Sequence, residues 1–92
     1  MNTIPKVKML ANNQFIIRTE DGNYLQSYDK IIAFKPFQGK VKLDPFYWDF
    51  SRTTSKYLRI FLNEPKKVTA DKIKDGIYLL FDLNGPHTIK FL

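Results

Sequence analysis

The hydrophobic residues of this chain change their spacing about halfway along its 92 residues, and this change constrains the fold most. Up to residue 43, apolar and polar residues alternate in short runs, which is typical of antiparallel strands with one solvated face. From Arg52 onward the apolar residues recur every three or four positions, as they do on one side of a helix. The sequence therefore predicts an α+β domain in which a β-meander precedes the helices.

The alternating runs predict an antiparallel meander of three to four strands. Asp21 and Gly22 stand between two of these runs and predict a type I′ hairpin turn, because that turn needs positive φ at both central residues. In the strand after this turn, Tyr24, Gln26 and Tyr28 are expected to share one face. Five runs are candidates for these three to four strands: residues 6–9, 14–19, 24–28, 31–35 and 40–43.

Residues 52–63 predict an amphipathic helix. Asp49 or Ser51 is its candidate N-cap, and it must end before Pro65, whose ring disfavours helical dihedrals in the preceding residue. At about 3.6 residues per turn, one side of this helix is apolar and the other is basic. The apolar side carries Thr54, Tyr57, Leu58, Phe61 and Leu62, and the basic side carries Arg52, Lys56 and Arg59.

A second, short helix and a C-terminal strand or hairpin are expected after Pro65. Thr69 is the expected N-cap of this helix, and Gly76 stands where a left-handed residue ends a helix. Residues 77–83 are apolar on both faces, which predicts a central strand, and residues 88–92 predict a possible last strand.

Length and composition indicate one small domain over residues 1–92. The chain is 43% hydrophobic, with one Trp, five Tyr and eight Phe, which is enough for one compact core. The absence of cysteine excludes disulfides, a thiolate zinc site and a cysteine nucleophile. No apolar run approaches the roughly 18 residues of a membrane span, and no signal peptide is visible, so a cytosolic protein is expected.

The inventory of possible catalytic and metal-binding residues is short. His87 is the only imidazole, and no serine that would complete a triad with it stands in a nucleophile-elbow context. Glu20 and Asp21 form the only adjacent acidic pair, and turn formation already explains them. The sequence therefore predicts a protein with no enzymatic activity, no catalytic residues, no metal site and no cofactor.

One acidic pattern has the loose spacing of a metal-dependent nuclease site. In such sites two carboxylates hold Mg²⁺ and a lysine assists, and Asp49, Glu64 and Lys66 match that order. The second carboxylate and the lysine normally lie on a strand, whereas here they are expected in a proline-containing loop. We therefore reject the nuclease interpretation in favour of a solvated loop.

The basic residues concentrate in the helical segment. The segment from Arg52 to Lys74 contains seven cations and only two anions, Glu64 and Asp71. Its net charge is therefore +5, and that of the whole chain is +6. The cations on the basic side of the helix form a stripe that is suited to a phosphate backbone, which predicts binding to nucleic acid, to DNA more than to RNA. The alternative is that these charges only solvate an exposed helix face. The predicted contacts are Arg52, Lys56, Arg59, Lys66 and Lys67.

Aromatic residues supply a second candidate contact. Trp48, just before the helix, is expected to plug the core between sheet and helix. Tyr24 and Tyr28 are expected to stack on unpaired bases or contact a protein if their strand face is exposed to solvent.

Residues 47–62 read YWDFSRTTSKYLRIFL and resemble a recurrent pattern, approximately YWD[YF]SxTTxKYxxxFL, in small uncharacterised proteins of bacteriophages of low-GC hosts. The likeness extends over about residues 14–84. It implies a phage-encoded protein in the cytoplasm of an infected bacterium and implies no activity. Lys56 is the matching residue that core packing explains least, because it projects from the basic side of the helix.

Three hypotheses follow for the function. The leading one is a non-enzymatic, phage-encoded protein that binds nucleic acid through the basic helix stripe. The alternative is a small inhibitor or modulator of a host or anti-phage defence protein, which would present its basic and aromatic residues to an acidic protein surface. The third is a structural homo-oligomer joined through a bare strand edge or an aromatic patch. The oligomeric state, monomer or dimer, stays open.

Overall fold

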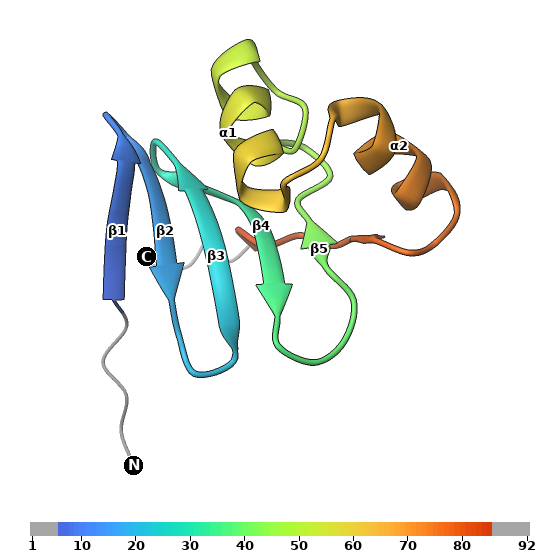
Figure 1. Cartoon of the computed structure of the whole chain (residues 1–92), viewed down its shortest axis with the longest axis horizontal. Coiled ribbons are helices and arrows are strands. Elements are labelled where there is room, and N and C mark those ends of the chain that lie inside the picture. Colours follow the sequence, from blue (N-terminus) through green and yellow to red (C-terminus); the bar gives the residue numbers. More distant parts are fainter. Residues whose placement is uncertain (1–5, 86–92) are drawn as a thin grey trace.

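The computed structural model describes residues 6–85, which form one sheet with two helices packed beside it (Figure 1). The expected α+β architecture is confirmed. The sheet contains six strands that lie side by side in chain order. The elements are β1 (Lys6–Ala11), β2 (Gln14–Arg18), β3 (Gly22–Ser27), β4 (Lys30–Pro36), β5 (Lys42–Leu43), α1 (Arg52–Leu62), α2 (Lys66–Lys74) and β6 (Leu79–Leu80).

The sheet is a meander that ends with one parallel pair. Neighbouring strands from β1 to β5 pair antiparallel, as the alternating pattern predicted. β6 pairs parallel to β5, with Leu43 opposite Leu80. Parallel neighbours cannot be joined by a hairpin, and α1 and α2 form the crossover between these two strands. The crossover packs α1 on β3 and β4 and leaves α2 beside β5 (Figure 1).

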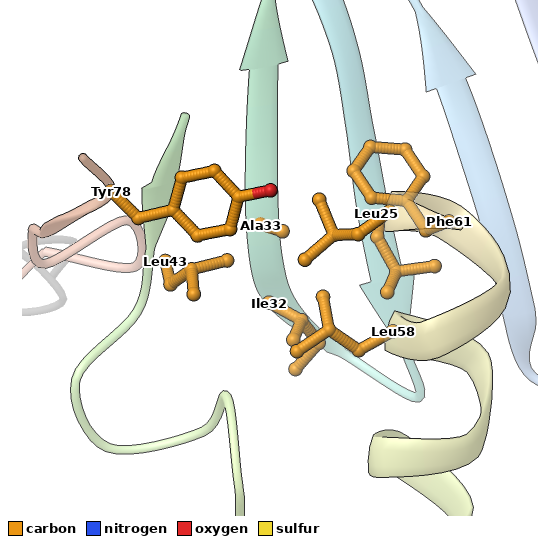
Figure 2. Close-up of a cluster of buried hydrophobic side chains, with 8 residues drawn as sticks. Leu25, Ile32, Ala33, Leu43, Leu58, Phe61 and Tyr78 are labelled. Atoms are coloured by element: carbon orange, nitrogen blue, oxygen red, sulfur yellow. The ribbon is translucent and has the colours of Figure 1, made fainter. Parts of the chain in front are cut away.

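The core lies between α1 and the middle of the sheet (Figure 2). Strand register places Leu25, Ala33 and Leu43 side by side, and each is fully buried. Trp48 is half-buried and packs against this cluster. Burying a large aliphatic side chain contributes about 1.5–3 kcal/mol, so these contacts fix the rotation of α1 about its axis. The side chains that α1 buries against the cluster are Leu58, Phe61 and Leu62.

The turn between β2 and β3 differs from the prediction. Thr19 and Gly22 close it with mutual backbone hydrogen bonds of 2.9 and 3.4 Å, so Glu20 and Asp21 are its central residues. Neither has positive φ, and the predicted type I′ turn is therefore wrong. Gly22 has φ 151° and is needed for close approach, because a Cβ there would lie 2.5 Å from the carbonyl oxygen of Lys35.

The predicted shared strand face of Tyr24 and Tyr28 is also wrong. The register of β3 against β4 shifts between Leu25 and Gln26, and the strand ends at Ser27, which pairs with Lys30. Tyr28 then falls in the β3–β4 turn with φ 58°. Tyr24 does lie on the face opposite Leu25, where it stacks on Phe34 with ring centroids 4.3 Å apart.

The second helix begins three residues before the expected cap. Pro65 is its N-cap, and the hydroxyl of Thr69, inside the helix and buried, donates to the Glu64 carboxylate at 2.7 Å. Backbone N–H groups at the start of a helix have no acceptor within the helix, and proline has no N–H, so Pro65 is well suited to this position. The prediction for Gly76 is confirmed: its φ is 75°, and its N–H bonds the carbonyl of Ile73 while the next N–H bonds that of Lys72.

The predicted central strand at residues 77–83 is wrong. Only Leu79–Leu80 pairs, as β6 at the end of the sheet order, and both leucines are exposed. Tyr78 is the residue of this run that enters the core. A run that is apolar on both faces forms a central strand only if other parts of the protein cover both faces of the sheet. Leu79 and Leu80 are exposed, so this condition is not met here. The strand predicted at residues 88–92 lies outside the described residues.

Candidate nucleic-acid interface

A shallow basic groove runs along the solvent side of α1 towards the start of α2. Arg52, Lys56 and Arg59 lie at helical spacing on α1, are exposed and line the groove together with Lys66 from α2. Asp49 supplies the only carboxylate of its lining, so four cations face one anion. The remaining lining residues are Ser51 and Ser55. We call this surface the basic groove.

The direction of the three α1 cations follows from the packing of the opposite side of the helix. Ser51 caps α1, because its hydroxyl accepts from the Thr54 backbone N–H at 3.2 Å. Thr54 is buried, and its hydroxyl lies 3.1 Å from that of Ser27 on β3. With Thr54 and Leu58 held inward, the cations at positions 52, 56 and 59 must face outward. In the described part of the chain none of the three forms an ion pair.

Lys66 and Lys67 are adjacent in sequence but differ in surroundings. Lys66 forms an ion pair with Asp49, which joins the first turn of α2 to the loop before α1. Lys67 lies 3.3 Å from Asp71 one turn along α2, has an 85% exposed side chain and does not line the basic groove. The structure therefore brings four of the five predicted basic residues together and leaves Lys67 apart.

The two tyrosines predicted as aromatic contacts also separate. Tyr24 stacks on Phe34 on the sheet face opposite Leu25 and the core, away from the basic groove. Tyr28 lines a second hollow, which shares Ser51 with the groove. Only Tyr28 is therefore placed near the basic residues.

A polar cluster fixes α2 against the end of α1. The Glu64 carboxylate, with a 9% exposed side chain, accepts from Lys72 Nζ at 2.7 Å, Thr69 Oγ1 at 2.7 Å and Tyr78 Oη at 3.0 Å. Burial raises the pKa of Glu64, but these hydrogen bonds outweigh burial and leave the pKa below its ordinary value. The hydrogen bond to Glu64 raises the pKa of Lys72. The pKa of Tyr78 is also raised, mainly by burial and secondly by the hydrogen bond to Glu64. The cluster is therefore ionised as a Glu64–Lys72 pair at neutral pH.

Sequence reasoning missed this cluster. Its members lie 5, 8 and 14 residues after Glu64, and no single helical or strand period joins those separations. The sequence predicts a solvated loop around Glu64, and this is wrong for its side chain, which is 9% exposed and accepts hydrogen bonds from Lys72, Thr69 and Tyr78. Among residues 6–85, no group of three histidine, aspartate or glutamate side chains is arranged to hold a metal ion.

Fold and surface together define a small α+β protein with a basic groove between two helices. The chain belongs to a family of unknown function, DUF8033, whose model matches residues 1–76. The matched region contains every residue that lines the basic groove and ends at Gly76. No curated protein and no solved structure matches the chain. In the described residues, no helix is long and apolar enough to cross a membrane.

Proposed function

We propose that this chain is a non-enzymatic, phage-encoded protein that binds nucleic acid in the cytoplasm of an infected bacterium. The observation that carries the proposal is the gathering of four cations from two helices around one open groove with a single carboxylate. The phage origin rests on the resemblance of residues 47–62 to phage proteins. DNA is the preferred ligand of this proposal.

The dimensions of the basic groove suit a phosphate backbone. Arg52 and Arg59 are seven residues apart on α1, which is about 10 Å along the helix axis. Phosphates of one strand of duplex DNA rise about 3.4 Å per nucleotide, so these two arginines span about three phosphate intervals. Their guanidinium groups are exposed and form no ion pair with any residue between 6 and 85, which suits forked contacts with phosphate oxygens.

A titration of labelled single-stranded and duplex DNA at several salt concentrations tests this proposal. The three α1 cations predict three phosphate contacts, because Lys66 is paired with Asp49, and affinity should therefore fall about 20- to 40-fold between 50 and 200 mM salt. The double substitution Arg52→Glu with Arg59→Glu should abolish binding at 50 mM salt. Lys6→Glu with Lys8→Glu changes the net charge equally on the exposed strand β1 and serves as the matched control. The proposal fails if wild-type protein does not bind at 50 mM salt, or if both double variants bind alike.

An inhibitor or modulator of a host or defence protein is the second candidate, and an apolar surface favours it. Val7 and Ile17 align with Tyr24 on the sheet face opposite the core, and Val7 is 62% exposed. Such a face suits a protein partner, which the basic groove would join through an acidic surface. A pull-down from host lysate separates the two candidates: a protein partner retained after nuclease treatment favours the modulator, and recovery of nucleic acid alone excludes it.

A further inference from the structure

We infer that the basic groove continues into an aromatic pocket that takes an unpaired nucleobase, so that the ligand is a single-stranded nucleic acid. This inference rests on the proposed nucleic-acid binding and names its substrate class. The pocket lies between the β3–β4 turn and the loop before α1, and Ser51 lines both the pocket and the basic groove. A strand whose phosphates contact Arg52 therefore has a base within reach of the pocket.

Three aromatic rings form the walls of this pocket. Tyr28 and Phe50 are 54% and 69% exposed, and Tyr47 packs edge-on against Phe50 with ring centroids 5.6 Å apart. Exposed rings beside cations provide faces on which any base can stack. Lys30 Nζ lies 5.5 Å from the centre of the Tyr47 ring, so the pocket carries a cation of its own.

The ring of Tyr28 stands on a fixed piece of backbone. Tyr28 has φ 58°, a conformation that disfavours a bulky side chain. Its N–H bonds the carbonyl of Asn13 at 2.7 Å, and its carbonyl accepts from the Gln26 side chain at 2.7 Å. The turn therefore fixes the backbone from which the Tyr28 side chain projects at the pocket, which reduces the ordering cost of stacking.

Three hydroxyl groups also line the pocket, beside the buried side chain of Ile32. The hydroxyls of Ser27 and Thr54 are buried and 3.1 Å apart, and the Ser51 hydroxyl lies 3.2 Å from that of Thr54. Each hydroxyl has one donor and two acceptor sites, so this group retains capacity for a further partner. A nucleobase combines a π-face with a polar edge and matches these surroundings, whereas an aliphatic ligand would leave the hydroxyls facing apolar groups.

The arrangement favours a single strand over a duplex. In a duplex the bases are stacked inside, and only their edges are reached through the grooves. The pocket walls are ring faces, which need a base that has left its stack. Asp29 at the pocket provides an acceptor for the exocyclic amino group of such a base.

The ligand side of the test uses the wild-type protein and needs no substitution. Binding is measured for three ligands of equal phosphate number: a cytosine oligonucleotide, whose bases carry an exocyclic amino group, the same backbone without bases, and a duplex. One stacked base predicts that removing the bases weakens binding at least fivefold. Equal affinity for the backbone with and without bases overturns the inference.

The protein side uses two exposed phenylalanines as a matched pair. Phe50→Ala removes a pocket wall, whereas Phe37→Ala removes a ring of similar exposure (67%) from the turn after β4. Phe50→Ala should weaken single-strand binding at least fivefold and leave duplex binding unchanged, and Phe37→Ala should change neither. Tyr28→Ala replaces Phe50→Ala if circular dichroism shows that Phe50→Ala does not fold.

The outcomes separate the inference from the proposed function. If Arg52→Glu with Arg59→Glu abolishes binding, but the ring variants bind like wild type and the base-free backbone binds as well as the oligonucleotide, the inference fails and the proposed function stands. If no nucleic acid binds, both fail.

Discussion

The two helices that border the basic groove are held by different physics. α1 buries Leu58, Phe61 and Leu62 and has a side-chain cap, whereas α2 buries only Thr69 and has no side-chain cap. α2 has one half-buried apolar contact with the core, through Ile73, and is held mainly by the Glu64 cluster and by the ion pair of Lys66 with Asp49. One wall of the groove therefore depends mainly on apolar burial and the other mainly on polar contacts, so the two should respond differently to substitution, pH and salt.

Loss of apolar packing under α1 should have the largest effect. Leu58→Ala removes a side chain that is 4% exposed, and we expect the free energy of unfolding to fall by about 2–5 kcal/mol. Denaturant unfolding followed by circular dichroism measures this loss. Ile60→Ala, on the same helix but at a 54% exposed position, is the control and should cost well under 1 kcal/mol. Similar losses in the two variants would refute the claim that burial holds α1.

Removal of the charge that holds α2 should have an intermediate effect. Glu64→Gln keeps the shape of the side chain but loses the ionised acceptor of Lys72, Thr69 and Tyr78. We expect the free energy of unfolding at pH 7 to fall by about 1–2 kcal/mol. Leu58→Ala provides the comparison, because its loss should not depend on pH.

The pH dependence of that effect has a definite sign. The folded state lowers the pKa of Glu64, so the carboxylate stabilises the protein above its ordinary pKa of 4.5 and this contribution is lost as the pH falls through the folded value. The difference between wild type and Glu64→Gln should therefore shrink below about pH 4. Lys72 and Tyr78 act at high pH. Because folding raises their pKa values, their protonated forms stabilise the folded protein, and this stabilisation is lost as the pH rises through the folded-state pKa values. A constant difference between pH 7 and pH 3 would contradict this role of Glu64.

The end of α2 should show a smaller, purely backbone effect. Gly76 has φ 75°, and no atom lies within 4 Å of a Cβ placed there, so Gly76→Ala should cost about 1 kcal/mol from the left-handed conformation alone. Gly76→Asn should recover part of this loss, because asparagine tolerates that conformation. Thermal unfolding of the two variants measures the difference, and equal transition temperatures for wild type and Gly76→Ala would exclude the assignment.

The smallest effect is expected at Lys67. Lys67→Ala removes an exposed ion pair with Asp71 outside the basic groove and should change single-strand affinity less than about twofold. Lys66→Ala removes a cation of the groove and exposes Asp49 to the ligand, so it should weaken binding several-fold. Fluorescence anisotropy on one oligonucleotide compares the pair directly. A larger loss of single-strand affinity for Lys67→Ala than for Lys66→Ala would contradict the placement of Lys66 in the basic groove and of Lys67 outside it.

Local patterns predicted the features that depend on near neighbours. The period of α1 placed Thr54, Leu58 and Phe61 inside, and the same period put Arg52, Lys56 and Arg59 together outside. The meander followed from alternation. In each case, sequence neighbours within one or two turns decide the outcome.

The failures concern features that distant residues decide. Thr69 was expected to be a cap, but Glu64 occupies its hydroxyl because α2 folds back on the end of α1. Residues 77–83 were expected to form a central strand, but β6 ends the order of the described strands, so its leucines are exposed. The separation of Lys66 from Lys67 depends on how α2 sits relative to Asp49, which no spacing in the sequence reveals.

The salt dependence of single-strand binding tests the central claim most directly, because its slope counts phosphate contacts. The three α1 cations, none of which forms an ion pair within residues 6–85, predict a slope of log affinity against log salt of about −2.1 for the wild-type protein. Arg52→Gln with Arg59→Gln removes two cations of the basic groove and should bring the slope to about −0.7. Lys6→Gln with Lys8→Gln should leave the wild-type slope unchanged. An unchanged slope in the arginine variant, or an equal change in the lysine variant, would contradict the assignment of the basic groove as the nucleic-acid interface.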